Sequence, residues 1–267
     1  MKGRLPILII IPHGGQRVPD ELSGLEVIDR FNLFIESDTC ANELFAFENE
    51  VISKIDTQIS RLFVDLDRSP LSTTQRSYDG VLKRETITGK KIYRDGVFPD
   101  EIAMTNILKR YYFPLHKSIE RIINKGEIKF IIDCHTMLAV GAKNSVDSGK
   151  PRPLIIIENI VKHNEKDIKT CTDELALGFL ECMKTFFSEE DATVAGRFNL
   201  NNNLFNPYIL KKYGLGSIPM LRFSISRSLF LNDTYFSYDY LRIDDIRISE
   251  LRKMIWKGIE KFSYKYL

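Results

Sequence analysis

The chain has 267 residues, of which 43% are hydrophobic and 28% are charged, a composition typical of a soluble globular protein and unlike that of a disordered chain or a coiled coil. Its 38 Lys and Arg against 36 Asp and Glu leave a formal charge of only +2, which argues against a nucleic-acid partner held by its phosphates. No apolar run approaches the roughly 18 residues of a membrane span, and the run at 7–11 is too short for a signal peptide, so we expect no membrane partner.

The cysteines are widely spaced and form no C-x-x-C pair; they are Cys40, Cys134, Cys171 and Cys182. This spacing argues against a thiolate zinc finger, and we expect reduced thiols and a cytoplasmic location. A metal site in this chain would therefore draw on its four histidines.

The first half of the chain is predicted to alternate strands with helices. Hydrophobic periodicity and turn residues predict, in chain order, a strand at 7–11, a helix at 38–54, a strand at 60–66, a loop at 69–96 and a helix at 100–124. Pro114 lies inside the last of these helices and should kink it or divide it into two pieces.

The second half continues the alternation. The same patterns predict a strand at 129–133, a loop at 141–153, a strand at 154–157, a helix at 165–187, a strand at 217–226 and a helix at 243–266. Alternating strands and helices predict an α/β fold whose central sheet is mostly parallel or mixed and carries helices on both faces. No linker or repeat divides the chain, so we expect one domain over residues 1–267.

Two histidines follow predicted strands. His13 follows the strand at 7–11 in the turn Pro-His-Gly-Gly, and His135 follows the strand at 129–133 in Asp-Cys-His-Thr. Side chains at the carboxyl ends of parallel strands meet in one crevice. Two histidines, one carboxylate and one open position form a common catalytic zinc site, and Asp38 or Glu36 would supply the carboxylate. The alternative is that each histidine is simply a polar residue at the end of a strand.

Charges are unusually dense in the segment 60–68, which contains Arg61, Asp65, Asp67 and Arg68. Buried Asp and Arg need partners, and an arginine fork suits a substrate carboxylate or a polarised carbonyl. The alternative is an internal Arg–Asp ion pair that fixes the loop. Basic residues of the following loop are expected to be solvated charges; they are Lys83, Arg84 and Arg94.

The sequence resembles a known family, the N-formylglutamate amidohydrolases. The resemblance rests on six short motifs in the family's order: Ile-Pro-His-Gly-Gly, Glu-Ser-Asp, Ser-Arg-Leu-Phe-Val-Asp-Leu-Asp-Arg, Thr-Gly-Lys-Lys-Ile-Tyr, Phe-Pro-Leu-His and Asp-Cys-His-Thr-Met. It covers residues 6–140 well and continues more faintly toward residue 230. It implies a phosphorylase/hydrolase-like α/β fold akin to zinc carboxypeptidases. It also implies hydrolysis of N-formyl-L-glutamate to formate and glutamate in histidine degradation.

The resemblance also implies roles for residues. It marks His13, His135 and Asp38 as ligands of one zinc ion, with Glu36 as the competing carboxylate. It makes Arg61, Arg68 and Arg197 candidates for binding the substrate, with Arg61 also a catalytic candidate that stabilises the developing oxyanion. His116 matches a further family histidine, and its role is either to support the site or to fill the core.

One departure from the family bears on mechanism. The water that attacks the amide needs a proton acceptor, and the family carries a Glu where this chain has Ser224. A serine cannot accept a proton at neutral pH without a base of its own. Glu158, at the end of the strand at 154–157, is the substitute that topology suggests.

Two functions from different classes follow. The first is a zinc-dependent amidohydrolase for a small N-acyl amino acid, of which N-formylglutamate is the example; another acyl amino acid or a peptide is an alternative within that class. The second is a homologue with altered or no catalysis that binds metal or a small carboxylate ligand. Monomer and small homo-oligomer both remain open.

Overall fold

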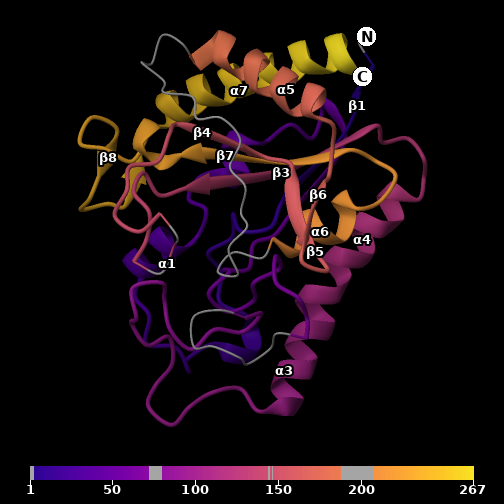
Figure 1. Cartoon of the computed structure of the whole chain (residues 1–267). Coiled ribbons are helices and arrows are strands. Elements are labelled where there is room, and N and C mark those ends of the chain that lie inside the picture. Colours follow the sequence, from indigo (N-terminus) through magenta and orange to yellow (C-terminus); the bar gives the residue numbers. More distant parts are fainter. Residues whose placement is uncertain (1–2, 72–79, 144, 146, 188–206) are drawn as a thin grey trace.

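The computed structural model describes residues 3–71, 80–143, 145, 147–187 and 207–267. At its centre lies a five-stranded sheet in the order β2-β1-β3-β7-β4 (Figure 1). Its strands are β1 (Leu5–Ile11), β2 (Val51–Asp56), β3 (Phe130–Met137), β4 (Ile155–Glu158) and β7 (Met220–Ser226). The first four strands of that order run parallel, and the edge strand β4 is antiparallel to β7. The predicted α/β fold with a mixed sheet is confirmed.

Helices cover both faces of the sheet (Figure 1). One face carries α2 (Ala41–Leu44), α5 (Asp173–Phe187) and α7 (Asp245–Tyr266), and the other carries α3 (Glu101–Ile107), α4 (Phe113–Ile123) and α6 (Tyr208–Gly214). Shorter elements are the helical turns η1 (Asp20–Leu22) and η4 (Arg227–Leu229), helix α1 (Arg30–Glu36), and the hairpins β5–β6 (Ile160–His163, Lys166–Lys169) and β8–β9 (Phe236–Ser237, Arg242–Ile243). No helix in the described ranges is long and apolar enough to cross a membrane.

The continuous aliphatic run of β1 is explained by these two layers. Ile7, Ile9 and Ile11 pack into the core under α5 and α7, whereas Leu8 and Ile10 pack into the core on the α4 and α6 side. A central parallel strand is buried on both faces, so both sets of alternating side chains must be apolar.

The same alternation places polar side chains on one face beyond the core. Ile131 of β3 and Met220 of β7 face the α4 side, and residues two and four positions further along each strand share that face. These are Asp133 and His135 on β3, and Arg222 and Ser224 on β7. Asp133 pairs with Arg222, and His135 pairs with Ser224, in adjacent register. The site therefore lies at the carboxyl ends of the parallel strands, on the α4 and α6 side.

The prediction of a helix at 38–54 was wrong over most of its length. Only α2 is helical there, and Val51–Asp56 forms the edge strand β2 beside β1. The β-branched residues of this segment favour an extended strand, and pairing with β1 satisfies their backbone groups. Helical spacing in the sequence could not reveal that partner.

The prediction of a strand at 60–66 was also wrong. The chain turns here, and the N–H groups of Phe63 and Val64 both donate to the carbonyl of Ser60. Leu62, Phe63 and Val64 are all fully buried, so the apolar run fills the core from a loop rather than from a strand.

Pro114 divides the long helix as predicted. A π-helical turn, η2 (Leu108–Tyr112), separates α3 from α4, and Pro114 lies at the start of α4. Proline has no N–H and its ring crowds the preceding turn, which accounts for the widened turn before it.

The predicted helix at 165–187 starts later than expected. The β5–β6 hairpin comes first, with Asn164 and Glu165 in its turn at positive φ, and α5 begins at Asp173. The strands predicted at 7–11, 129–133, 154–157 and 217–226 and the helix at 243–266 are confirmed, with small shifts of their ends.

Candidate active site

His13 lies in the tight turn that follows β1. This turn requires glycine after the histidine, because a Cβ on Gly15 would lie 2.2 Å from the backbone carbon of Gln58. The carbonyl of His13 accepts a hydrogen bond from the N–H of Asp38 at 2.9 Å. The turn thus holds Asp38, which follows α1, against the end of β1.

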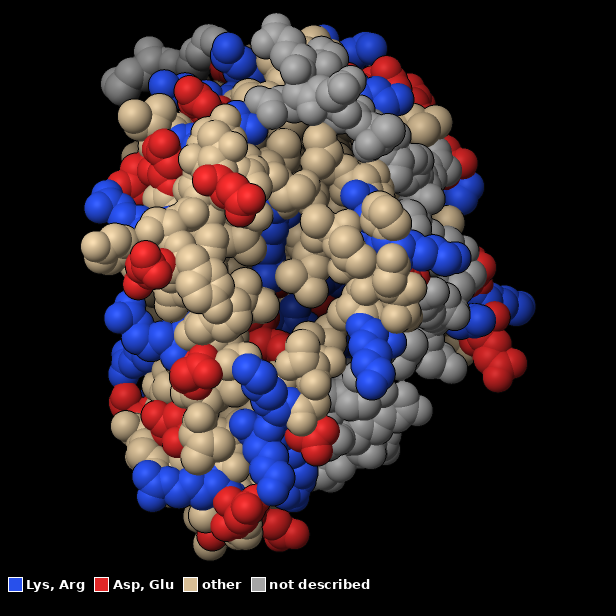
Figure 2. Space-filling model, turned by 90° about the vertical axis from the view of Figure 1, so that its left-hand side faces the viewer, with Lys and Arg blue, Asp and Glu red and all other residues tan. Residues whose placement is uncertain are grey.

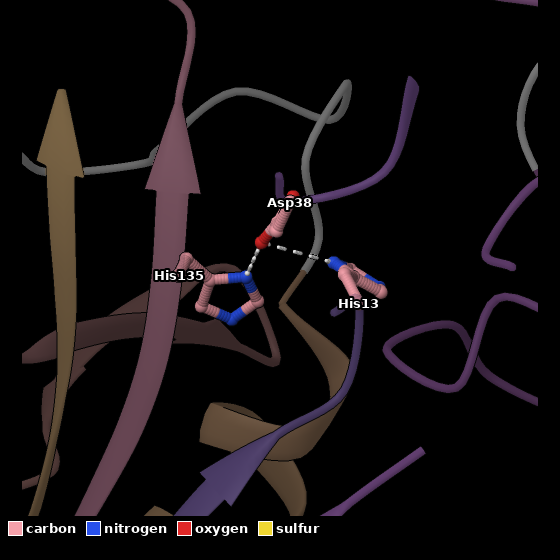
Figure 3. Close-up of side chains that lie close together, drawn as sticks. All are labelled: His13, Asp38 and His135. Carbon is pink, nitrogen blue, oxygen red and sulfur yellow. Dashed lines mark hydrogen bonds and ion pairs between the residues drawn. The ribbon is translucent and has the colours of Figure 1, made fainter. Parts of the chain in front are cut away.

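Each histidine directs one ring nitrogen at the same carboxylate oxygen (Figure 3). The distance from Asp38 Oδ2 is 2.7 Å to His135 Nδ1 and 3.8 Å to His13 Nδ1. The two ring centroids are 5.1 Å apart. His13 Nδ1 is buried and has no hydrogen-bond partner among the described residues.

The other nitrogen of each ring is held by a buried carboxylate. His13 Nε2 lies 2.7 Å from Asp65 Oδ1, and His135 Nε2 lies 2.9 Å from Asp133 Oδ1. Both carboxylates are fully buried. Such outer carboxylates fix the orientation of a metal-binding imidazole and leave the opposite nitrogen for the ion.

Arg227 fixes the turn that carries Asp38. Its guanidinium donates to the carbonyls of Ile35 at 2.6 Å and Ser37 at 2.5 Å, and to Thr136 Oγ1 at 3.3 Å. Its Nη2 also lies 3.6 Å from Asp38 Oδ1. This arginine, directly after β7, therefore ties the Asp38 turn to the neighbouring strand β3.

The two histidines differ in charge. Burial and the nearby Arg61 lower the pKa of His13 to about 3, so this ring is neutral at pH 7. Burial and Arg222 also oppose the charging of His135, but Asp133 and Asp38 outweigh them and raise its pKa to about 9. Burial alone would raise the pKa of Asp38, but hydrogen bonding and charge attraction from His135 hold it below its usual range.

Lys83 is not the solvated charge that the sequence predicted. Its side chain is buried, and its Nζ lies 2.7 Å from Asp65 Oδ2. Burial, reinforced by repulsion from Arg61, lowers the pKa of Lys83 to about 8. A buried carboxylate needs a counter-charge, and Lys83 supplies one to Asp65.

Arg61 occupies a more open position. Its Nη1 lies 3.4 Å from Asp38 Oδ1 and its Nη2 lies 3.4 Å from Asp65 Oδ2. Its side chain is 22% exposed, against 3% for that of Asp38. These contacts are long for charge-assisted hydrogen bonds, so the guanidinium keeps capacity for a ligand that approaches from solvent.

A second charged cluster lies around Arg222 on β7. Its Nη1 is 3.0 Å from Asp67 Oδ2, and its Nε is 3.8 Å from Asp133 Oδ2 and 3.6 Å from Glu158 Oε2. Its Nη2 lies 3.2 Å from His135 Nδ1. Burial raises the pKa of Glu158 to about 7. Glu158 thus contacts Arg222 directly and reaches His135 only through that guanidinium.

Three further residues were named from the sequence: Glu36, Arg68 and Arg197. Glu36 is the last residue of α1, and its Oε1 accepts from the N–H of Ile87 at 3.1 Å. Burial raises the pKa of Glu36. Arg68 is largely buried and donates to the carbonyl of Asp67 at 2.9 Å. Arg197 lies outside the described residues.

His116 supports the loop of the site. Its Nε2 lies 3.1 Å from the carbonyl of Leu66, and its Nδ1 lies 2.8 Å from the hydroxyl of Tyr213. Burial lowers its pKa to about 4, so the ring is neutral. His116 is therefore both a buried side chain and a contact of the segment that carries Asp65 and Asp67.

Sequence reasoning missed the roles of Arg222, Arg227 and Asp133. The signal was present for two of them, because Arg222 and Asp133 are charged residues within otherwise apolar strands, and such charges need partners. Arg227 follows β7 and has no pattern of its own, since its acceptors are backbone carbonyls from a distant turn.

The residues present fit a divalent metal ion. Among the described residues, His13, Asp38 and His135 offer three ligand atoms that lie within 4.8 Å of one another. The unpartnered Nδ1 of His13 and the outer carboxylates on both Nε2 atoms match what zinc requires of histidine. A second group that meets the same test, Asp67, Asp133 and His135, already surrounds the Arg222 cation.

Figure 2 shows a hollow in the face toward which the carboxyl ends of β3 and β7 point in Figure 1. Basic and acidic side chains lie at its bottom, and much of its rim is tan, the colour of residues that are neither basic nor acidic. A charged bottom within a largely neutral rim suits a small polar ligand.

The sequence profile of the N-formylglutamate amidohydrolase family matches residues 5–231. The chain belongs to this family. The N-formylglutamate deformylase of Pseudomonas aeruginosa is 27% identical over 135 residues, which are 48% of this chain and 49% of that protein. The chain thus aligns with about half the length of the curated relatives that it matches.

Two solved structures share the fold over nearly the whole chain. The N-formylglutamate amidohydrolase of Ralstonia eutropha superposes with a TM-score of 0.69 at 16% identity and covers 98% of this chain and 95% of that one. A gene product of Agrobacterium tumefaciens superposes with a TM-score of 0.63 at 16% identity and covers 96% and 91%. These likenesses establish the fold of this family member.

Proposed function

We propose that the protein is a zinc-dependent amidohydrolase that cleaves a small N-formyl amino acid, with N-formyl-L-glutamate as the first candidate. One observation carries the proposal: the Nδ1 atoms of two buried histidines point at one oxygen of Asp38, while a buried carboxylate holds each Nε2. Membership of the amidohydrolase family and the name of the Pseudomonas aeruginosa relative support the choice of substrate.

His13, Asp38 and His135 would hold the ion. Asp38 rather than Glu36 is our choice of carboxylate, because Asp38 Oδ2 is the atom on which both rings converge. When bound, zinc lowers the pKa of a water and polarises a carbonyl.

Arg61 is our candidate for binding the substrate. Its exposure and long contacts leave it able to bind a carboxylate of the substrate or the developing oxyanion. Arg68 and Arg197 remain further candidates for the second carboxylate of a dicarboxylic substrate. The choice of a dicarboxylate over an apolar amino acid rests on the family and on the name of the Pseudomonas aeruginosa relative.

Glu158 is our candidate for the proton acceptor in place of the residue replaced by Ser224. A pKa of about 7 suits a group that takes a proton from the attacking water and returns it to the leaving amine. In the balanced reaction, water adds to the formyl carbon and the C–N bond breaks. Formate and the free amino acid leave.

A second candidate function is favoured by Ser224 itself. Ser224 pairs with His135 in register and faces the same side of the sheet, so the β7 residue beside the histidine carries no carboxylate. The chain would then bind metal and an acyl amino acid without turnover.

Formate release distinguishes the two. The parent protein loaded with one equivalent of zinc should release formate from N-formyl-L-glutamate. The His13→Ala variant, treated in the same way, should release none. N-acetyl-L-glutamate, followed by release of acetate, tests the acyl group, and N-formyl-L-methionine, followed by release of formate, tests the side chain. Zinc binding with no release of formate from any N-formyl amino acid would contradict the hydrolase and support the function of binding without turnover.

We also propose a cytoplasmic location and a role in histidine degradation. The four cysteines are widely spaced in the sequence and form no C-x-x-C pair, which supports a reducing compartment. The role in histidine degradation rests on the choice of N-formylglutamate as substrate.

A further inference from the structure

Two groups contact His135 Nδ1, and hydrogen bonding cannot satisfy both. Asp38 Oδ2 lies 2.7 Å from this nitrogen, and Arg222 Nη2 lies 3.2 Å from it. If Nδ1 carries a hydrogen, that hydrogen serves Asp38 and faces the N–H of Arg222. If Nδ1 has no hydrogen, it accepts from Arg222 and its lone pair faces the carboxylate. Either arrangement leaves one of the two contacts unfavourable.

Arg222 is not free to move away from this point. Asp67 Oδ2 holds its Nη1 at 3.0 Å, and Glu158 Oε2 and Asp133 Oδ2 lie 3.6 Å and 3.8 Å from its Nε. Asp67 is itself fixed, since its Oδ1 accepts from the N–H of Ile209 at 2.8 Å. Three buried carboxylates therefore surround the Nη1 and Nε sides of the guanidinium, and Nη2 is the side that faces the histidine.

A metal ion on His135 Nδ1 would occupy the lone pair of that nitrogen, so Nδ1 could no longer accept a hydrogen bond from Arg222. The Nη2 donor would lose its acceptor while the three carboxylates kept it in place. A buried N–H without a partner is costly, so the site then favours a ligand oxygen at this position.

We propose that Arg222 Nη2 is the donor that binds the oxygen of the scissile formyl group, which makes Arg222 a catalytic residue of this site. This inference deepens the proposed function and rests on it for the identity of the substrate. A preorganised donor beside a developing oxyanion stabilises the transition state without having to reorient.

Arg61 and Arg222 would then divide the substrate between them. The Arg61 side chain is 22% exposed, and that of Arg222 is 12% exposed and lies among buried carboxylates. The outer arginine suits a carboxylate of the amino acid, and the inner one suits the small acyl end.

The two products test this division without any need for turnover. Formate carries the former carbonyl oxygen, and L-glutamate carries the carboxylates but no acyl oxygen. We would measure the dissociation constants of both by chemical-shift titration of zinc-loaded parent, Arg222→Gln and Arg222→Lys proteins. A hydrogen bond to a charged donor contributes about 1.5–3 kcal/mol, so formate should bind about tenfold or more weakly to both variants. The dissociation constant of glutamate should change less than about twofold.

Two comparisons serve as controls for misfolding of the variants. Arg222→Lys keeps a cation among the three carboxylates, so it should melt close to the parent. A lysine cannot reach both Asp67 and the position beside His135, so it should still bind formate more weakly. Arg247→Lys changes another buried arginine, whose Nε donates to the carbonyl of Leu229, and should leave both dissociation constants unchanged.

Unchanged formate binding in both Arg222 variants would overturn the assignment, and so would equal weakening of formate and glutamate. A parent that binds no formate would also overturn it. If the parent binds formate through Arg222 but releases none from N-formylglutamate, the proposed reaction is wrong, whereas the role of Arg222 as an oxygen-binding donor stands.

Discussion

The two histidine halves of the site share one geometry but differ in the charge of the ring. In each half, a buried carboxylate holds Nε2 and the ring directs Nδ1 at Asp38. In the metal-free protein, His13 is neutral with a pKa of about 3, whereas His135 is charged with a pKa of about 9. Equivalent places at the ends of two parallel strands thus do not give equivalent chemistry.

The difference arises from what surrounds each carboxylate. Asp65 shares its charge among His13, Lys83 and Arg61, so little of its attraction is left for a proton on His13. On the other side, His135 lies within hydrogen-bond distance of both Asp133 and Asp38. An imidazole between two carboxylates is held in its charged form even in a buried site.

Removal of either imidazole should have the largest effect, because three ligand atoms are needed from two halves. His13→Ala and His135→Ala should each lower zinc affinity by more than about a hundredfold, beyond the range seen for outer partners. Formate release should fall to the background rate. Zinc content after dialysis and a formate assay measure both, with His163→Ala as the matched control. If only one of the two variants lost zinc, the halves would not form one site.

Glu158 belongs to the His135 half alone, and its replacement tests what that half adds. An acid with a pKa of about 7 must be ionised to accept a proton, so activity should rise with pH through about 7. Glu158→Gln should lower kcat by about a hundredfold and remove that rise. If kcat fell but the rise stayed, Glu158 would support Arg222 without accepting the proton.

Stability gives Glu158 a second readout. Its folded pKa lies above the unfolded value, so the stability it contributes is present below about pH 4.5 and is lost as pH rises through about 7. Relative to the parent, Glu158→Gln should therefore be more stable at pH 8 than at pH 4.5. Urea unfolding at the two pH values measures this, and a difference that does not depend on pH would contradict it.

Replacing Asp65 or Asp133, the carboxylates that hold the Nε2 atoms, should distinguish the two halves by stability. Asp133→Asn and Asp65→Asn should each cost about 10–100-fold in zinc affinity. Asp65→Asn should also destabilise the fold by about 3 kcal/mol, because it leaves buried Lys83 without its close partner. Zinc titration together with denaturant unfolding measures both effects. Equal stability of the two variants would show that Lys83 finds another partner.

The smallest predicted effect is a count of protons. His135 is charged at pH 7 and His13 is not, so zinc binding should release about one proton, from His135. In the free protein, the raised pKa of His135 contributes stability below about pH 6.5 that is lost as pH rises through about 9. Calorimetry in buffers of different ionisation enthalpy counts the protons. Release of two would mean that His13 is charged as well.

Most of the fold was predictable because its strongest signals are local. Aliphatic runs marked β1, β3 and β4, and the long amphipathic pattern marked α7. The errors fell where tertiary contacts decide, as in β2, which is a strand because β1 lies beside it, and in Leu62–Val64, which are buried from a loop.

The site was predictable in part. His13, His135 and Asp38 stand out as rare or charged residues at strand ends and loop turns, and the structure brings all three together. Lys83 and Arg227 could not be found in this way, because their partners are a carboxylate and carbonyl groups distant in the chain.

By itself, the sequence determined which side chains are available for chemistry and on which strands they sit, because alternation along a buried strand fixes the face of each residue. Only the tertiary structure decided their charges and partners. Burial removes water, and the pKa of a buried group is then set by the few neighbours that the fold places within a few ångströms. For this reason His13 and His135 occupy similar positions in the sequence but carry different charges in the folded protein, where His13 is neutral and His135 is positive.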